Sequence, residues 1–202
     1  MIRYLFDPAN AITATGIVFS GLALHFALNG QFEAAVALGL WAMLADQLDG
    51  IVAGRTRNRS KEVANFGKSI DGFADLVYGA VLPAVIVVGL SKETPISFVT
   101  GIVLLLVGAI RLSYFSNFGL SADRRFLGVP LSYDIPLLAV LLLCRPWLGD
   151  DIFPLLTNLI FLSLAALHIA SIRIPAPNTI AYGCIVVFAL GASAALVTRA
   201  LA

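Results

Sequence analysis

The sequence predicts an all-α fold, a polytopic integral membrane bundle of about six to eight transmembrane helices that forms one domain over residues 1–202. Hydrophobic residues make up 59% of the chain and charged residues only 12%, which is more apolar than ordinary soluble domains. Apolar runs also recur along the chain at about the 20-residue length that a helix needs to cross a bilayer. These two observations exclude a soluble protein and leave no stretch for a separate soluble domain.

The predicted elements follow in chain order. The first ten residues mix apolar side chains with Arg3 and Asp7, which is typical of a short interfacial segment. The first apolar run ends in Leu28-Asn29-Gly30 without a small-residue cleavage site, so we expect it to remain as a span. In all, we interpret seven runs as spans, at about residues 11–29, 32–54, 66–90, 95–115, 130–148, 153–171 and 177–199.

The positions of Lys and Arg predict the orientation, because cytoplasmic loops retain basic residues. With the N-terminus inside, ten basic residues are cytoplasmic and three lie outside. The ten are Arg3, Arg55, Arg57, Arg59, Lys61, Lys68, Arg111, Arg124, Arg125 and Arg173. We therefore expect a protein of the inner (cytoplasmic) membrane, with the polar ends of the second and third spans facing the cytoplasm.

Charge, cysteine and histidine content exclude other classes. The net charge of +1 argues against a nucleic-acid partner. Cys144 and Cys184 share no metal or redox spacing, so we expect both to be small core residues. His25 and His168 are single histidines in apolar runs, where a hydrogen-bonded core position is the more common role.

Four aspartates in the second and third spans are the strongest indication of function. Asp46 and Asp49 are three positions apart, and Asp71 and Asp75 are four apart, so each pair lies on one helix face. Carboxylates at membrane depth are paired, neutral or metal-bound, because a bare charge is costly there. Carboxylate oxygens suit Mg²⁺ or Mn²⁺, which also bind substrate phosphates. The pattern predicts a site for divalent ions.

The segment Asp46-Gln47-Leu48-Asp49-Gly50-Ile51-Val52-Ala53, followed by Gly67, Asp71 and Asp75, resembles the signature of the CDP-alcohol phosphotransferase (CDP-alcohol phosphatidyltransferase) family. That signature is D-x2-D-G-x2-A-R-x8-G-x3-D-x3-D, and seven of its eight fixed positions match in order. The arginine departs from it, because Gly54 separates Ala53 from Arg55 and the following loop is longer. The segment from Pro8 to Thr13 is similar to the family's P-N-x-I-T entry to the first span.

Further segments are similar to the bacterial phosphatidylserine synthase branch of this family. They are Phe73-Ala74-Asp75 with Pro83-Ala84, Arg111-Leu112-Ser113-Tyr114-Phe115, Phe126-Leu127-Gly128-Val129-Pro130 and Ala170-Ser171-Ile172-Arg173-Ile174-Pro175. The resemblance implies a homodimeric enzyme that transfers a phosphatidyl group from CDP-diacylglycerol to a polar alcohol, with L-serine favoured, and releases CMP. It further implies two divalent ions, Mg²⁺ or Mn²⁺, held by Asp46, Asp49, Asp71 and Asp75, with Asp75 as the general base.

There are two sets of candidate binding residues, and the resemblance implies the first. The CDP-binding set is Asn10, Thr13, Asp49, Gly50, Ala53, Arg55 and Gly67. Small residues let the nucleotide approach the helix backbone, and an arginine presents a forked donor to the diphosphate. Because the loop is longer, Arg57 or Arg59 could replace Arg55. The candidates for binding the acceptor alcohol are Arg111, Arg125 and Asp134. Asp134 departs from the family's pattern, and it could face an amine-bearing acceptor or indicate an acceptor other than serine.

Several alternatives stay open. The aspartates could form structural ion pairs with Arg55 or Lys68, the glycines could simply allow close helix packing, and Arg111 could be a snorkelling residue. Arg124 and Arg125 fit a basic cytoplasmic loop as well as a ligand site. Other acceptors include inositol phosphate, glycerol phosphate, choline and other amino alcohols. A cation-coupled transporter could also use intramembrane carboxylates, although its site is expected near the membrane midplane.

Overall fold

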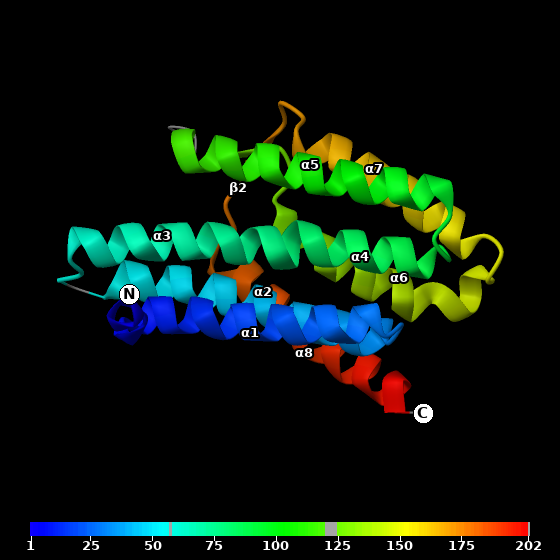
Figure 1. The fold of residues 1–202 in the computed structure, drawn as a ribbon, viewed down its shortest axis with the longest axis horizontal. Helices are drawn as coiled ribbons and strands as arrows, with labels where there is room; N and C mark the ends of the chain where they lie inside the picture. Colours follow the sequence, from blue (N-terminus) through cyan, green and yellow to red (C-terminus); the bar gives the residue numbers. More distant parts are fainter. Residues whose placement is uncertain (57, 120–124, 202) are drawn as a thin grey trace.

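The computed structural model describes residues 1–56, 58–119 and 125–201 and confirms an all-α bundle (Figure 1). Arg57 and Arg124, which we expected in cytoplasmic loops, lie outside these residues. The helices are η1 (Ile2–Phe6), α1 (Pro8–Leu28), α2 (Phe32–Arg55), α3 (Lys61–Leu76), η2 (Val77–Val81), α4 (Leu82–Leu90), α5 (Pro95–Phe118), η3 (Leu131–Tyr133), α6 (Asp134–Leu148), α7 (Phe153–His168) and α8 (Thr179–Leu201). The two strands are β1 (Arg125–Leu127) and β2 (Arg173–Pro175).

Every apolar run that we interpreted as a span corresponds to a helix. Within the described ranges, six helices are long and apolar enough to cross a membrane: Pro8–Leu28, Phe32–Arg55, Lys61–Leu90, Pro95–Phe118, Leu131–Leu148 and Thr179–Leu201. The remaining run, at 153–171, forms α7, which has only 16 residues. At 1.5 Å per residue α7 is about 24 Å long, short of a hydrocarbon core of about 30 Å. The seven expected spans are therefore six long helices and one short one.

Local sequence signals explain where several helices begin. Asp7 caps α1 by accepting a hydrogen bond from the Asn10 backbone nitrogen at 3.2 Å, and Pro8 occupies the first helical position. Ser60 caps α3 in the same way, through the Val63 nitrogen at 3.3 Å. These caps fix the start of the two helices at the end of the bundle where the aspartates lie.

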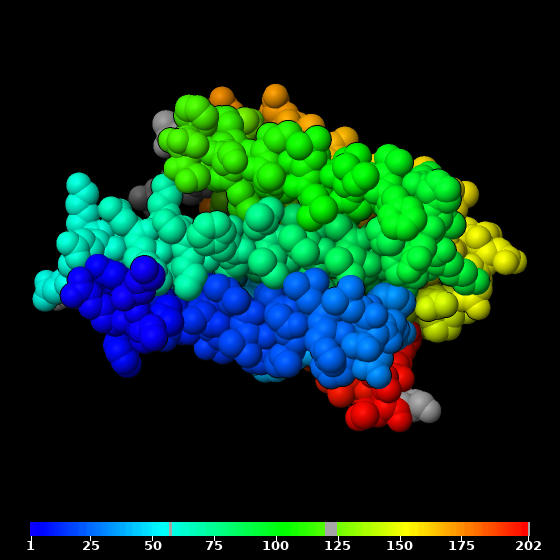
Figure 2. Space-filling view, in the orientation of Figure 1, coloured from blue at the N-terminus to red at the C-terminus, as the bar shows by residue number. Residues whose placement is uncertain are grey.

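The bundle is arranged so that α2 and the α3–α4 helix face each other. Figure 1 shows α1 and α2 lying alongside the continuous helix of α3, η2 and α4, with α5 and α7 forming a layer on one side. The space-filling view shows α1, the α3–α4 helix and α5 as successive bands across one face (Figure 2). On the other side α8 packs against α2 and α6. The core includes large side chains from the central helices: Leu40, Met43, Leu82, Ile86, Ile135, Leu138 and Phe161.

A small antiparallel sheet and a π-helical turn are features that the sequence did not predict. The sheet pairs β1 with β2 in a register that places Phe126 opposite Ile174, and so ties the loop after α5 to the loop after α7. The π-helical turn is η2, which joins α3 to α4 without a break. Such turns are rare and occur often at functional sites.

Two of the four Cys and His expectations are wrong. Cys184 is exposed on α8 and His25 is exposed near the end of α1. Periodicity cannot reveal such positions in a membrane protein, because lipid-facing residues are as apolar as core residues. Cys144 is partly buried, and His168 is buried and hydrogen-bonded as expected.

Candidate metal and nucleotide site

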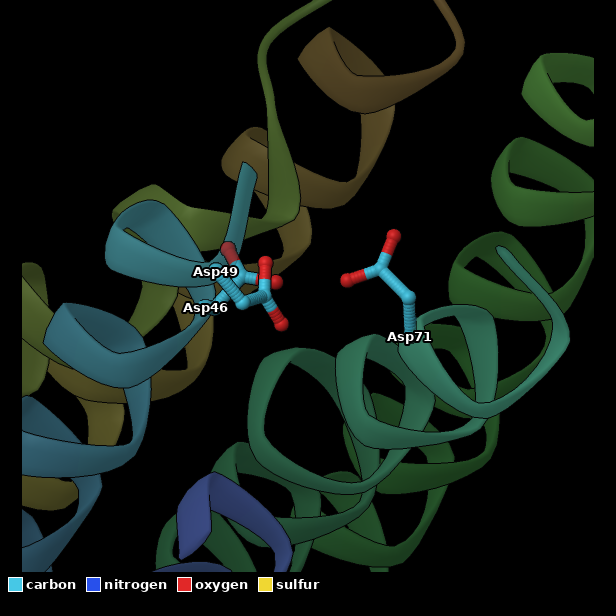
Figure 3. Close-up of side chains that lie close together, drawn as sticks. All are labelled: Asp46, Asp49 and Asp71. Atoms are coloured by element: carbon cyan, nitrogen blue, oxygen red, sulfur yellow. The ribbon is translucent and has the colours of Figure 1, made fainter. Parts of the chain in front are cut away.

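The structure brings three of the four aspartates into one group. Asp46 and Asp49 lie on α2 and face Asp71 on α3 across a narrow gap (Figure 3). Each contributes a carboxylate oxygen, and these oxygens lie within 4.8 Å of one another. A donor set made only of carboxylates fits a hard divalent cation such as Mg²⁺ or Mn²⁺. This geometry supports the predicted metal site and makes α2 and α3 its two walls.

Asp75 lies one turn further along α3 and outside that three-residue group. Its side chain lies beside those of Asp46 and Tyr78, and all three line one hollow. The Tyr78 hydroxyl donates to Asp46 Oδ2 at 2.9 Å, and the tyrosine is buried in η2. Sequence reasoning missed Tyr78, although it follows Asp75 by three positions and so continues the same helix face. Asp75 thus lies next to the group, beside Asp46 and Tyr78.

Two polar side chains of α1, Asn10 and Thr13, lie next to the site. The buried hydroxyl of Thr13 donates to Asp49 Oδ2, which orients that carboxylate. Asn10 is only 1% exposed, and its side-chain nitrogen donates to the Tyr4 carbonyl at 2.9 Å. Its side-chain oxygen accepts from Arg59 Nη2, also at 2.9 Å. Thr13 therefore acts on the aspartate group itself, whereas Asn10 joins α1 to the loop before α3.

The two glycines of the signature differ in their surroundings. A Cβ at Gly67 would collide with the Asn10 amide oxygen, so this glycine allows α1 and α3 to approach closely. A Cβ at Gly50 would meet no atom within 4 Å in the described structure, and Gly50 is exposed and lines the aspartate cavity. Packing thus explains Gly67, whereas Gly50 lies at an open surface of the cavity.

Of the candidate arginines at and after the end of α2, Arg59 takes part in a structural ion pair. It forms a forked ion pair with Asp7, through Nη2 to Oδ1 at 2.8 Å and Nε to Oδ2 at 3.1 Å. Arg55 is exposed at the last position of α2, and Ala53 is half-buried on the same turn. Arg57 lies outside the described residues. Neither Ala53 nor Arg55 lines the aspartate cavity.

The aspartates open into a cavity of about 390 Å³, here called the aspartate cavity. All four aspartates line it on one side, together with Gln47 and Gly50. The opposite wall comes from the small sheet and the elements after it: Phe126, Pro130, Ser132, Tyr133, Ile174, Pro175, Pro177, Tyr182 and Ile185. Sequence reasoning missed this wall, because it depends on the pairing of two loops that are far apart in the chain.

A smaller hollow of about 220 Å³, here called the side hollow, lies next to Asp75. It is lined by Asp46, Asp75, Tyr78, Arg111, Leu112, Phe115, Phe126, Pro130, Leu131 and Ser132. Arg111 is buried there, with its guanidinium 4.6 Å from the centre of the Phe115 ring. Its Nη1 donates to the carbonyls of Leu127 at 2.7 Å and His168 at 3.0 Å. Arg111 is therefore both a wall of the hollow and an anchor for β1.

The other two acceptor candidates lie away from these hollows. Asp134 is 0% exposed, and its Oδ1 lies 3.2 Å from His168 Nε2. The Nδ1 atom of His168 lies 2.7 Å from the Val129 carbonyl, which can only accept, so Nδ1 carries a proton. Asp134 thus faces a buried histidine and not a cavity. Arg125 is exposed on β1 opposite Pro175.

Comparisons with known proteins agree with this architecture. The family model for CDP-alcohol phosphatidyltransferases matches residues 6–196. The chain is 30% identical over 155 residues to the archaetidylserine synthase of Methanothermobacter thermautotrophicus, covering 76% of this chain and 63% of that protein. It is 33% identical over 184 residues to the CDP-diacylglycerol--serine O-phosphatidyltransferase of Helicobacter pylori, covering 85% of this chain and 72% of that protein.

A protein of the same name from Methanocaldococcus jannaschii is 30% identical over 167 residues, which cover 80% of this chain and 74% of that protein. The aligned region thus covers less than two thirds of the length of the archaetidylserine synthase. It covers 72% and 74% of the lengths of the two serine O-phosphatidyltransferases. The family match runs from the N-terminal segment into α8 and includes the aspartates of α2 and α3. The chain belongs to the CDP-alcohol phosphatidyltransferase family.

Proposed function

We propose that this protein transfers a phosphatidyl group from CDP-diacylglycerol to a polar alcohol, with L-serine as the favoured acceptor, and releases CMP. The observation that carries the proposal is the group formed by Asp46, Asp49 and Asp71, which faces a cavity in a bundle of apolar helices. The relatives named CDP-diacylglycerol--serine O-phosphatidyltransferase support the choice of acceptor.

The carboxylate group fits divalent ions, and we propose two, Mg²⁺ or Mn²⁺, held by Asp46, Asp49, Asp71 and Asp75. When bound, such ions neutralise the charge of a diphosphate and stabilise the departing CMP. Thr13 holds the Asp49 carboxylate in place for this role. The donor set supports ions of this kind, because within the described residues the grouped ligand atoms are all carboxylate oxygens.

Asp75 is our proposed general base, which accepts the hydroxyl proton of the attacking alcohol. It borders both the aspartate cavity and the side hollow, so an acceptor in the side hollow would place its hydroxyl between Asp75 and the lipid diphosphate. Asp46 and Tyr78 lie beside this carboxylate, and the Tyr78 hydroxyl donates to Asp46. Direct in-line attack on the phosphorus is the simplest course for this arrangement.

Arg111 gives the side hollow its preference among alcohols. Its buried guanidinium would pair with the carboxylate of serine or with the phosphate of inositol phosphate or glycerol phosphate. Choline carries no anionic group and is therefore disfavoured. The pairing of Asp134 with His168 favours a supporting role for Asp134. His168 also supplies one of the two carbonyls that bind Arg111. Arg125 stays a candidate at the edge of the sheet.

For the nucleotide we propose Asn10, Thr13, Asp49, Gly50, Ala53, Arg55 and Gly67. Gly50 has the strongest support, since nothing in its packing requires a glycine. The ion pair between Arg59 and Asp7 favours Arg55 as the partner of the diphosphate. We also propose a homodimer in the cytoplasmic membrane with the aspartates facing the cytoplasm, on the basis of the family and the loop charges.

The test is CMP release by the purified protein in detergent with CDP-diacylglycerol and Mn²⁺ or Mg²⁺. Serine, inositol phosphate, glycerol phosphate and choline are added one at a time. We expect release with serine and formation of an equal amount of phosphatidylserine. Release with another acceptor would correct the substrate. No release with any acceptor, from protein that also fails to bind CDP-diacylglycerol, would contradict the proposed function.

A further inference from the structure

A hollow of about 630 Å³ lies where α4 meets α5, at the end of the bundle away from the aspartates, and we call it the far groove. Helices α1 and α5 flank α4 there, as neighbouring bands in Figure 2. The volume is in the range of about 300–1,000 Å³ that is typical of ligand sites. Among the described residues, the far groove shares no lining residue with the aspartate cavity or the side hollow, so it is separate from the proposed substrate site.

The far groove follows one face of α5 into the membrane-spanning part of the bundle. Its lining on α5 takes the positions i, i+3, i+4 and i+7 of one helix face, which are Phe98, Gly101, Ile102 and Leu105. From Phe98 to Leu105 this face runs about 10 Å, at a rise of about 1.5 Å per residue. One leaflet of the hydrocarbon core is about 15 Å deep. The groove is therefore long enough to cover most of the depth of a leaflet.

Close packing at two glycines shapes the floor of the far groove. A Cβ at Gly101 would lie 3.1 Å from Val88 Cγ2, and a Cβ at Gly89 would lie 2.6 Å from Phe32 Cζ. Because these positions carry no side chain, α5 packs closely on α4, and the Phe32 ring packs on the α4 backbone. The hollow is thus a groove with a packed floor.

Glu93 forms the polar end of the far groove. Among the described residues that line the groove, Glu93 carries the sole charge, and every other one is apolar or a glycine. Lys92 and Glu93 both have left-handed backbone conformations, with φ of 51° and 55°, which are uncommon for residues other than glycine. The Glu93 nitrogen donates to the Val88 carbonyl at 3.1 Å, which holds this turn against the end of α4. Within the described ranges Glu93 forms no ion pair, so its carboxylate is open to a cationic ligand.

We propose that the far groove binds a phospholipid whose zwitterionic head group ends in a primary ammonium, as in phosphatidylethanolamine, from the leaflet on the other side of the membrane from the aspartates. The ammonium donates charge-assisted hydrogen bonds to the Glu93 carboxylate. Exposed Lys92 precedes Glu93 and supplies a positive charge for the lipid phosphate. One acyl chain lies along Phe98, Ile102 and Leu105, where it gains van der Waals contact with the helices.

The division of the groove into one carboxylate and a long apolar stretch matches the division of such a lipid into ammonium and chain. A head group with an exposed anion and no ammonium would be repelled by Glu93. The bound lipid is a structural ligand and not a substrate, because its head group lies away from the aspartates.

The first test compares two lipids that differ only in the methyl groups of the head group. Dioleoylphosphatidylethanolamine and dioleoylphosphatidylcholine carry the same chains, phosphate and net charge, but the trimethylated ammonium of the second has no N–H to donate. In native mass spectrometry of the purified full chain in detergent, the wild type should bind the ethanolamine lipid about three-fold more tightly, the size expected of an exposed ion pair. Glu93→Gln should remove this preference. Asp151→Asn, which removes an exposed carboxylate from the α6–α7 connection, is the matched control and should keep it.

A second variant tests whether the lipid lies in the far groove. Ile102→Trp places a bulky ring in the groove and should weaken binding of the ethanolamine lipid several-fold. Because Ile102 is 65% exposed, the ring does not crowd the core. Ile96→Trp is the control, since it makes the same change at an exposed position about 120° around α5.

Three results of these binding tests would overturn the inference. One is equal affinity of the wild type for the two lipids, and another is unchanged binding of the ethanolamine lipid by Ile102→Trp. The third is an altered oligomeric state of Ile102→Trp with unchanged lipid binding, which would assign the groove to a second copy of the chain.

A labelling experiment tests the groove without a tryptophan variant and without turnover, so this inference and the proposed function fail independently. In a background with Cys144 and Cys184 replaced by alanine, N-ethylmaleimide labels the Phe98→Cys variant, whose position lines the groove, and the Ile96→Cys variant, whose position does not. The ethanolamine lipid should slow labelling of Phe98→Cys several-fold more than the choline lipid does. Both lipids should affect Ile96→Cys equally. Equal protection of Phe98→Cys by the two lipids would overturn the inference.

Discussion

Two glycines in the same signature lie in different surroundings. Gly67 lies where α3 approaches Asn10 on α1, and any side chain there must displace a hydrogen-bonded amide. Gly50 lies at an open surface of the aspartate cavity, where a methyl group would fit without a clash. The motif alone cannot separate these roles, because packing and ligand approach both select glycine.

Substitution by alanine should therefore affect stability at Gly67 and lipid binding at Gly50. Gly67→Ala should lower stability by ~1–3 kcal/mol through overpacking and reduce the melting temperature in detergent. Gly50→Ala should melt like the wild type but bind CDP-diacylglycerol more weakly. Thermal melting and lipid binding, measured on both variants, check this. A stable Gly67→Ala protein beside a destabilised Gly50→Ala protein would contradict the assignment.

The Tyr78 hydroxyl is a second residue-scale feature with a measurable role. Tyr78→Phe keeps the buried ring and removes the donor to Asp46, so that carboxylate loses its orientation. Loss of such a supporting contact typically costs ~10–100-fold in metal affinity or activity. We expect a higher Mn²⁺ requirement for CMP release. Tyr114→Phe, at an exposed position on α5, is the control, and an unchanged Mn²⁺ dependence in Tyr78→Phe would rule out this role.

At the scale of elements, the sheet is held to the bundle by a buried polar cluster. Arg111 binds the Leu127 and His168 carbonyls, and the His168 ring lies between Asp134 and the Val129 carbonyl. The sequence could not predict this arrangement, because three-residue strands joined over a long separation leave no periodic signal. The long helices, in contrast, follow directly from the lengths of the apolar runs.

Removing one partner of that cluster should be costly. His168→Leu leaves Asp134 buried without its partner, and we expect a loss of ~3–5 kcal/mol. The double variant Asp134→Leu with His168→Leu should recover part of the loss, since an apolar pair replaces the polar one. Thermal melting of the three proteins in detergent measures this. If the double variant is no more stable than His168→Leu, the two side chains do not act as a pair.

At the scale of the whole molecule, the four aspartates lie toward one end of an apolar bundle. The sequence predicted this from the spacing of four aspartates and from ten basic residues on one side, and the structure places three aspartates within reach of one ion. It did not predict that Asp75 would lie beside this group, next to Tyr78. The helical spacing of residues fixes which residues share a face but not the rotation of one helix against another.

The orientation can be tested at the two ends of the bundle. The α2–α3 connection and the α6–α7 connection lie at opposite ends (Figure 1), and they contain Asn58 and Asp150 respectively. In a background with Cys144 and Cys184 replaced by alanine, a membrane-impermeant maleimide should label Asp150→Cys in intact spheroplasts. It should label Asn58→Cys only after the membrane is opened. The reverse pattern would contradict the proposed cytoplasmic face.

The most direct test of the central claim is CMP release by Asp75→Asn, compared with the wild type and with Asp150→Asn. Asp150 is exposed and pairs with Arg145 on a loop far from the aspartates in the chain, so its variant controls for loss of a carboxylate. We expect Asp75→Asn to bind CDP-diacylglycerol while its rate falls by ~10²–10⁴-fold, as loss of a general base predicts. Asp150→Asn should keep the wild-type rate. A wild-type rate in Asp75→Asn would show that another group accepts the alcohol proton.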